Sequence, residues 1–322
     1  MREQLLDLIN TKDLSFIQQA IGLNESLDEE VLSKEEIISQ LRPYDKNREQ
    51  VAFVLQAFDG KGFESFTELK LSAESVSSLP EGIGRLKNLR RLSLARSAVT
   101  ILPEAIGALH NLEFLNLRGT KLSQLPRAIG NLNKLEILSL RDAPISTLPE
   151  EIGNLRNLRK LYLGRTGLSS LPDSIGCLDQ LEVLRINQTS LSSLPDSIGR
   201  LHNLQELDLG ETELVSLPDS ICALENLELL NLGRTRLTTL PENLGLLRSL
   251  RGLSIRGAQI SCLPGSICEL EKLDFLDLID VQLEFWPKQI RKLKQLETLY
   301  LRSGQFSALP RRVRHWKALR YV

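Results

Sequence analysis

The sequence predicts an α/β solenoid, a curved horseshoe with a concave parallel β-sheet, convex short helices and an N-terminal helical cap. Two observations predict this fold. Eleven of the 13 prolines lie 23 residues apart without a slip, from Pro80 to Pro310, and one apolar frame, LPxxIGxLxxLxxLxLxxTxLxx, surrounds them. A unit of this length cannot bury its own leucines and isoleucines, so successive units must stack into one shared core.

Each repeat is expected to contain one strand and one return segment. In the copy around Pro195, Leu207 and Leu209 alternate with variable residues at the period of a β-strand. Pro195 followed by Asp196 suits the first turn of a short helix, because proline needs no partner for an amide there. Strands at the same place in every repeat should pair in parallel, with the helices on the opposite side.

This frame resembles the leucine-rich repeat. Its 23-residue form is similar to the repeats of Ras-suppressor-type scaffolds, plant intracellular Ras-group relatives and bacterial leucine-rich repeat proteins. The resemblance covers residues 69–322 and implies a horseshoe that binds proteins, without naming a partner. We therefore expect a leucine-rich repeat solenoid of about eleven repeats over residues 63–322, with no evident C-terminal cap.

Two columns of the repeat depart from the family pattern. The position after the strand usually holds asparagine, but here it reads Ser97, Thr120, Ala143, Thr166, Thr189, Thr212, Thr235, Ala258, Val281 and Gly304. The threonine hydroxyls predict a partial hydrogen-bond ladder between repeats in the middle of the stack. A second column holds mostly glycine, and Cys222 and Cys268 replace it twice, which indicates a need for small size more than for positive φ.

Residues 1–62 lack the frame and are expected to be helical. Ser33 and Glu36 form a capping-box pattern before an apolar run that Pro43 ends. The segment carries 12 acidic and seven basic residues. We expect it to cap the first repeat, because the end of a solenoid needs cover. The alternative is a separate partner-binding module.

The other end of the chain is abrupt, since Val322 falls where a further strand would begin. Either a longer chain was cut here or a partner covers this end. Residues 288–322 carry ten Lys or Arg against one acid, Glu297. Core leucines continue through this stretch, so we interpret it as a repeat with solvated basic side chains, which would bind anionic surfaces weakly at most.

Composition argues against several classes of protein. The chain is 42% hydrophobic with a formal charge of −1, so no global field favours nucleic acid or a membrane as partner. Residues 1–12 form no signal peptide or membrane span. The four cysteines show neither metal-binding nor disulfide-framework spacing. We expect a cytoplasmic protein with reduced thiols, or one delivered into a host cytoplasm if it is a bacterial effector.

No motif for catalysis is present in the sequence, neither a phosphate loop nor a dinucleotide, metalloprotease or nucleophile-elbow pattern. Cys177 and Asp179 resemble the Cys-x-Asp of bacterial leucine-rich repeat ubiquitin ligases, but they lie inside a repeat and no activating base is identifiable. His110 and His202 lie four repeats apart, too far to share a metal. We predict no enzyme, no cofactor, no metal site and no small-molecule substrate.

The variable strand positions point away from the core and form the concave face, where a ligand would bind. In the first five repeats, basic side chains lie beside outward apolar ones, and aromatic residues and arginine are typical binding anchors. We predict ten partner-binding residues: Arg91, Arg96, Phe114, Arg118, Ile137, Arg141, Tyr162, Arg165, Val183 and Arg185. The last five repeats reverse the balance, with five carboxylates against three arginines on this face.

The leading hypothesis is a non-enzymatic scaffold for protein–protein interaction, whose concave face binds a protein partner with an acidic rim. The resemblance suggests a small GTPase, kinase or phosphatase as that partner. The alternative is the substrate-recognition domain of a larger signalling enzyme or bacterial effector, for example a ubiquitin ligase, truncated at Val322. Nucleic-acid binding by the basic terminal stretch is a third hypothesis, disfavoured because no recognised module accompanies the charge. The oligomeric state stays open.

Overall fold

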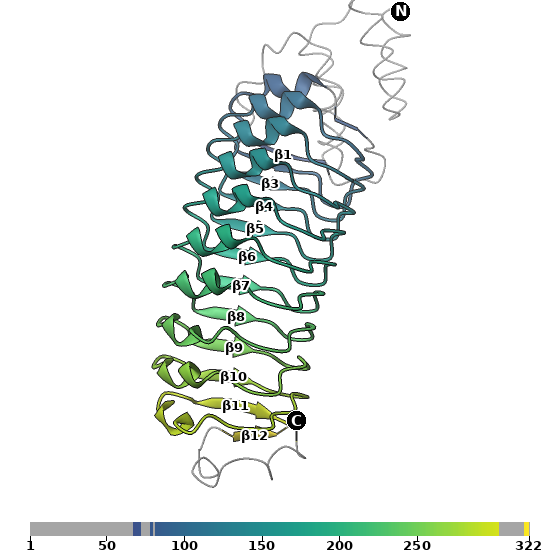
Figure 1. Cartoon of the computed structure of the whole chain (residues 1–322). Coiled ribbons are helices and arrows are strands. Elements are labelled where there is room, and N and C mark those ends of the chain that lie inside the picture. Colours follow the sequence, from purple (N-terminus) through teal and green to yellow (C-terminus); the bar gives the residue numbers. More distant parts are fainter. Residues whose placement is uncertain (1–66, 72–77, 80, 303–318, 322) are drawn as a thin grey trace, which may run out of the picture.

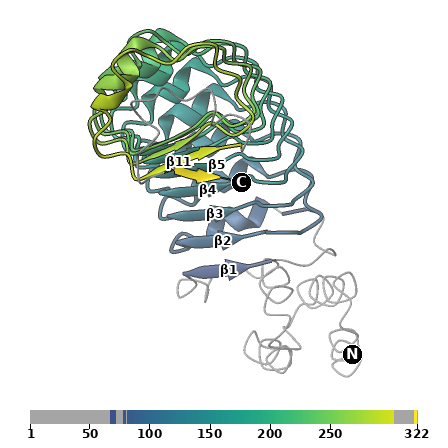
Figure 2. The ribbon, with the colours of Figure 1, turned by 90° about the horizontal axis from the view of Figure 1, so that it is seen from below.

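A computed structural model describes residues 67–71, 78–79, 81–302 and 319–321. Within them, 12 strands form one sheet in which every strand pairs with its neighbours in chain order. Figure 1 shows the strands stacked one after another from β1 to β12. Figure 2 looks along this stack: the sheet forms one wall, the short helices form the opposite wall, and the stack curves and twists. The predicted solenoid is confirmed.

The strands are three or four residues long, and every pairing is parallel. They are β1 (Glu68–Lys70), β2 (Arg91–Ser93), β3 (Phe114–Asn116), β4 (Ile137–Ser139), β5 (Lys160–Tyr162), β6 (Val183–Arg185), β7 (Glu206–Asp208), β8 (Leu229–Asn231), β9 (Gly252–Ser254), β10 (Phe275–Asp277), β11 (Thr298–Leu301) and β12 (Leu319–Tyr321). Leu92 lies opposite Leu115, so the repeat period becomes the register of the sheet. The last pairing departs from it, because Leu299 lies opposite Leu319, 20 residues ahead.

The return segments are 3-10 helices: η3 (Glu81–Arg85), η4 (Glu104–Ala108), η5 (Arg127–Asn131), η6 (Glu150–Asn154), η7 (Asp173–Cys177), η8 (Asp196–Arg200), η9 (Asp219–Ala223), η10 (Leu244–Leu246), η11 (Gly265–Glu269) and η12 (Ile290–Lys292). Extended Pro103 precedes η4 with φ −70° and ψ 154°, and its carbonyl accepts from the Ile106 amide at 3.1 Å. Bonds between residues three apart suit such short helices, because the tighter 3-10 helix advances more per residue.

The core is one apolar column that runs through all the described repeats. In the repeat of η4 and β3, the side chains of Ile106, Leu109, Leu112, Leu115 and Leu117 are all 0% exposed. Successive strand residues point to opposite faces, so the two strand leucines enter the core while their neighbours face outward. Truncating one such leucine to alanine is expected to cost about 2–5 kcal/mol.

Close approach of neighbouring helices explains the glycine column. A Cβ built on Gly176 would lie 2.4 Å from the carbonyl oxygen of Ser197, 21 residues ahead. Among the described glycines, only Gly119 and Gly257 have positive φ, so the expectation that the column requires small size is confirmed. Large side chains are excluded because they would collide with the backbone of the next repeat.

The two cysteines of this column change the helix that follows each of them. The residues 21 positions ahead of Cys222 and Cys268 are Asn243 and Gln289, which lie outside η10 and η12 with ψ of 19° and 14°. These helices contain three residues, whereas the other described ones contain five. A cysteine side chain therefore displaces the backbone that a glycine would have allowed to come close.

The threonine column does not connect repeats. The Thr120 hydroxyl donates to the carbonyl oxygen of Leu117, three residues earlier in its own turn, at 2.8 Å, and the Thr166 and Thr212 hydroxyls do the same. The prediction of a ladder between repeats is therefore wrong. At Ala143, the backbone amide alone donates to the Leu140 carbonyl, at 3.1 Å.

Asparagines on the flank between helix and strand connect neighbouring repeats instead. The Asn111 side-chain amide donates to the Lys87 carbonyl at 2.8 Å, and Asn157 donates to the Asn133 carbonyl at 2.6 Å. Asn203 and Asn226 repeat this contact. Each bond reaches back 24 residues, so each of these four side chains connects its repeat to the previous one.

The expected N-terminal cap over residues 1–62 lies outside the described residues, as does the whole stretch from 303 to 318, so both boundaries remain predictions. In the described part of the chain, no helix is long and apolar enough to cross a bilayer.

Candidate functional site

Five neighbouring strands, β2 to β6, bring the ten predicted binding residues onto one face. They occupy four rows that run across the strands: Arg91, Phe114, Ile137 and Val183 in the first; Tyr162 and Arg185 in the second; Arg118 and Arg141 in the third; Arg96 and Arg165 at the turn that follows the strand. Lys160 lies between Ile137 and Val183 in the first row. The apolar side chains are therefore near one another, with a lysine among them.

Two arginines of this face lie over its aromatic rings. The Arg91 guanidinium carbon is 4.3 Å from the centroid of the Phe114 ring, and that of Arg185 is 5.7 Å from the Tyr162 ring. Both rings are half-buried, as are Ile137 and Val183. Cation–π contacts of this kind hold a guanidinium in place at partly exposed sites, so the rings orient the arginines on the face.

Three further arginines lie within ion-pair distance of the Asp142 carboxylate. Arg118 Nε donates to Asp142 Oδ2 at 3.1 Å, while Arg141 Nε and Arg165 Nη1 lie 3.7 and 3.8 Å from the same carboxylate. Among the described residues, no carboxylate lies within ion-pair distance of Arg96. One negative charge among several arginines leaves this part of the face positive.

The turn row owes its geometry to a left-handed backbone. Arg96, Asp142 and Arg165 have φ of 61°, 62° and 58°, and the Arg96 amide donates to the Arg118 carbonyl in the next repeat at 2.7 Å. A left-handed φ costs energy for residues other than glycine. The backbone hydrogen bond that these turns make to the next repeat stabilises this conformation. The turn thereby sets polar side chains along one edge of the face.

Beyond β6 the charge on the face reverses. Arg185 makes two bonds to Glu206, with Nε to Oε1 at 2.6 Å and Nη2 to Oε2 at 3.1 Å, and these raise the pKa of Arg185. Asp208 follows in the second row, where burial raises the pKa of its carboxyl group. Its Oδ1 accepts from the Gly210 amide at 3.1 Å and from Asn231 Nδ2 at 2.7 Å. Asp208 thus accepts hydrogen bonds both from its own repeat, just after β7, and from the next repeat.

Sequence reasoning did not select the apolar residues of the C-terminal half. Leu229 on β8 is 49% exposed, whereas the apolar residues selected in the N-terminal half are half-buried. Leu229 and Phe275 approach each other over Gly252, and the Phe275 and Tyr300 rings meet edge to face with centroids 5.5 Å apart. The sequence held one signal for this pair, a glycine between two apolar residues in the first row.

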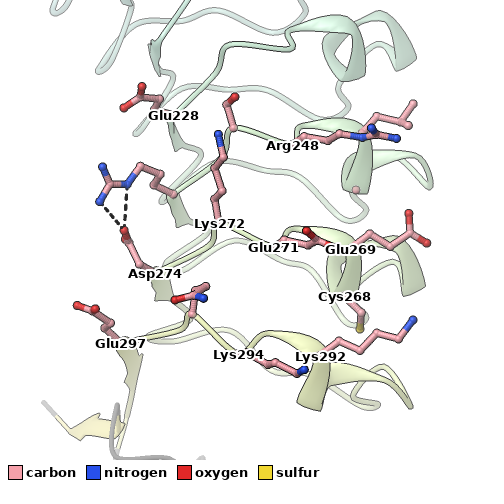
Figure 3. Close-up of a pocket in the computed structure, with 15 residues that line it drawn as sticks. Glu228, Arg248, Cys268, Glu269, Glu271, Lys272, Asp274, Lys292, Lys294 and Glu297 are labelled. Atoms are coloured by element: carbon pink, nitrogen blue, oxygen red, sulfur yellow. Dashed lines mark hydrogen bonds and ion pairs between the residues drawn. The ribbon is translucent and has the colours of Figure 1, made fainter.

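A groove of about 1330 Å³ lies on the flank beside this half (Figure 3). Charged side chains of both signs line it, among them Arg248, Lys272, Lys292, Glu269 and Glu271. Figure 3 shows Asp274 at the edge of the sheet, and its Oδ2 lies 3.0 Å from Arg251 Nη2. Because side chains of both charges line the groove, it favours neither an anionic nor a cationic ligand.

A family model for a leucine-rich repeat region matches the chain over residues 65–139, 127–190, 174–237 and 226–322. The chain belongs to the leucine-rich repeat family. The resemblance found in its 23-residue frame is thereby confirmed. No curated protein matches this leucine-rich repeat chain.

Solved structures share the fold of this leucine-rich repeat chain. A leucine-rich repeat protein of Leptospira interrogans is 26% identical with a TM-score of 0.65, covering 97% of this chain and 92% of its own. A chain from an octameric complex of latrophilin 3, Unc5D and FLRT2 is 22% identical with a TM-score of 0.63, covering 80% and 84%. A chain from the PEPR1–AtPEP1 crystal structure is 23% identical with a TM-score of 0.59, covering 76% and 39%.

The cysteines and histidines in the described part of this leucine-rich repeat chain form no cluster with metal-binding potential. Among the described residues, no group of three His, Cys, Asp or Glu side chains could hold a metal ion. Cys222 and Cys268 are buried, and burial raises the pKa of the Cys222 thiol to about 11. Such thiols are poor nucleophiles near neutral pH, because the thiolate is the reactive form.

Proposed function

We propose that this leucine-rich repeat chain is a non-enzymatic protein-interaction module that binds a partner with an acidic rim on β2 to β6. One observation carries the proposal: Arg118, Arg141 and Arg165 share the single carboxylate of Asp142. Their remaining positive charge would attract a negative surface and speed its encounter with this face.

The aromatic residues would supply binding energy after the encounter. Phe114 and Tyr162 each offer a half-buried ring beside an arginine, and binding hot spots are enriched in tyrosine and arginine that lose their water on contact. The arginines are already oriented by the rings, so less side-chain entropy is lost when a partner arrives.

Relatives in fold occur in protein complexes. These are an octameric complex of latrophilin 3, Unc5D and the leucine-rich repeats of FLRT2, and PEPR1 with AtPEP1. At this level of identity, the likeness supports use of the fold for protein binding and names no partner for this chain.

The test compares partner capture by the intact chain and by its Phe114→Ala, Tyr162→Ala double variant, using quantitative mass spectrometry of proteins bound from a lysate. We expect loss of specific partners by at least about tenfold. The matched control, Ile101→Ala with Val215→Ala, removes apolar side chains that are 62% and 55% exposed and lie outside the strands. It should capture partners as the intact chain does.

Circular dichroism must show that both variants are folded at the temperature of capture. Equal capture by the aromatic variant would place the binding face elsewhere. The alternative, a recognition domain of a larger enzyme, predicts a catalytic domain encoded after residue 322, which sequencing of the gene beyond that position would test.

A further inference from the structure

We propose that the C-terminal half of the concave face is a second docking site, for an extended peptide segment of a protein partner that presents a lysine or arginine beside an apolar side chain. The site is the apolar strip formed by Leu229, Phe275 and Tyr300 on β8, β10 and β11, with Gly252 of β9 beneath it. It is separate from the proposed site on β2 to β6 and does not depend on it.

The strip is continuous because Gly252 has no side chain. A Cβ at this position would lie 2.7 Å from Leu229 Cδ2 and 3.9 Å from Phe275 Cδ1, so these two side chains lean over the same point from neighbouring strands on either side. The Phe275 ring then meets the Tyr300 ring at 5.5 Å and an interplanar angle of 62°. Four strand positions thus present one apolar surface, with Leu229 49% exposed at its end.

Negative charge surrounds the strip. On β7 to β11, their turns and the adjoining sheet edge, there are eight carboxylates and four arginines: Glu206, Asp208, Glu211, Glu228, Asp274, Asp277, Asp280 and Glu297, with Arg234, Arg251, Arg256 and Arg302. Three of these arginines lie within ion-pair distance of carboxylates. Arg251 lies 3.0 Å from Asp274, and Arg302 lies 2.9 Å from Asp280. Arg234 lies 3.8 Å from Glu211. The excess favours a cationic ligand.

The sheet edge contributes carboxylates directly beside the strip. Figure 3 shows Glu228, Asp274 and Glu297 one below another along this edge, with Lys272 and Lys292 on the side toward the helices. Glu228 immediately precedes Leu229, and Asp274 immediately precedes Phe275. A basic side chain lying along the strip would therefore meet carboxylates while its partner's apolar residues cover Leu229.

The N-terminal half indicates what the strip lacks. There the protein itself places Arg91 over Phe114 and Arg185 over Tyr162. Among the described side chains, no cation lies over the ring of Phe275 or Tyr300. The residue opposite Tyr300 on the next strand is Arg320 of β12, so the comparison between the halves applies to Phe275. A ring flanked by carboxylates attracts a guanidinium or ammonium group, which the partner would supply over Phe275.

The test uses the full chain, immobilised for selection from a displayed library of random peptides of roughly ten residues, long enough when extended to cross the face. Selected peptides are then synthesised and measured by fluorescence anisotropy. We expect them to combine lysine or arginine with leucine or an aromatic residue, and to bind Leu229→Ala, Phe275→Ala at least about tenfold more weakly. A scrambled peptide of the same composition should lose at least as much.

Two control variants distinguish this strip from the rest of the surface. Phe285→Ala removes a side chain that is 72% exposed outside the strands, and Phe114→Ala, Tyr162→Ala removes the rings of the N-terminal half; both should keep full affinity. Glu228→Gln, Glu297→Gln leaves the strip intact and should make binding weaker and less steeply dependent on salt, which keeps the proposal testable if the strip variant fails to fold.

The proposal is overturned if the selected peptides lack basic residues, if they bind the strip or carboxylate variants as tightly as the intact chain, or if selection yields no binder. A loss caused by Phe114→Ala, Tyr162→Ala would assign the peptides to the N-terminal half instead.

Discussion

Arginines cover the aromatic rings in the N-terminal half of the sheet, whereas in the C-terminal half the rings pack on each other among carboxylates. The convex side differs too. From η4 to η8 glycine allows each helix to approach the next closely, but Cys222 and Cys268 precede the shortened helices η10 and η12. One repeat frame thus carries two different surfaces, because the core restrains only the inward residues.

The largest expected effect concerns the convex side. Gly176→Val would put a Cβ 2.4 Å from the Ser197 carbonyl oxygen, and we expect a loss of about 3 kcal/mol in the free energy of unfolding. Cys222→Val, at the same column in the C-terminal half, should cost less than about 1.5 kcal/mol because that backbone has already moved. Thermal unfolding followed by circular dichroism compares the two, and equal losses would contradict the difference between the halves.

The next largest effect is expected in the alkylation rates of two cysteines in the C-terminal half. Exposed Cys262 should react with iodoacetamide at least about a hundredfold faster than Cys222, whose pKa is raised to about 11. Peptide mapping by mass spectrometry at pH 8 gives both rates. The two rates should become similar after denaturation in urea, and a fast reaction at Cys222 in the folded chain would show that helix η9 opens.

Replacing arginines by glutamates on the concave face and, as a control, on the convex helices tests whether the position of the charge matters. Arg118→Glu, Arg141→Glu should slow association of a captured partner by about tenfold at low salt, with the difference shrinking as salt rises. Arg127→Glu, Arg200→Glu makes the same change of charge on the convex helices η5 and η8 and serves as the control. Stopped-flow fluorescence measures both rates; equal slowing would mean that only net charge matters.

The smallest effect is expected at Asp208. Burial raises the pKa of this carboxyl group in the folded protein, so its contribution to stability is greatest below its ordinary pKa and falls as pH rises through the raised value. Asp208→Asn keeps an oxygen for the Gly210 amide and does not titrate. We expect a small gain in the urea midpoint at pH 7 and none at pH 3. A gain that persists at pH 3 would refute this cause.

Much of the fold could be predicted from the sequence, because the information is local and repeated. Proline every 23 residues and the alternation of leucine predicted the strand, the return segment and the register, such as Leu92 opposite Leu115. The inward leucines and isoleucines had to be buried together, since no single repeat has a core of its own. The outward rows followed from the alternation of the strand.

The tertiary structure alone decided contacts between residues 21 to 24 positions apart. Threonine was expected to connect repeats, but its hydroxyl reaches its own turn, and asparagines such as Asn111 on the flank make the connection. The collection of arginines at Asp142 and the approach of Leu229 and Phe275 over Gly252 also depend on distances between repeats. Composition limits which side chains stand in a row, but the spacing, curvature and twist of the stack determine which of them touch.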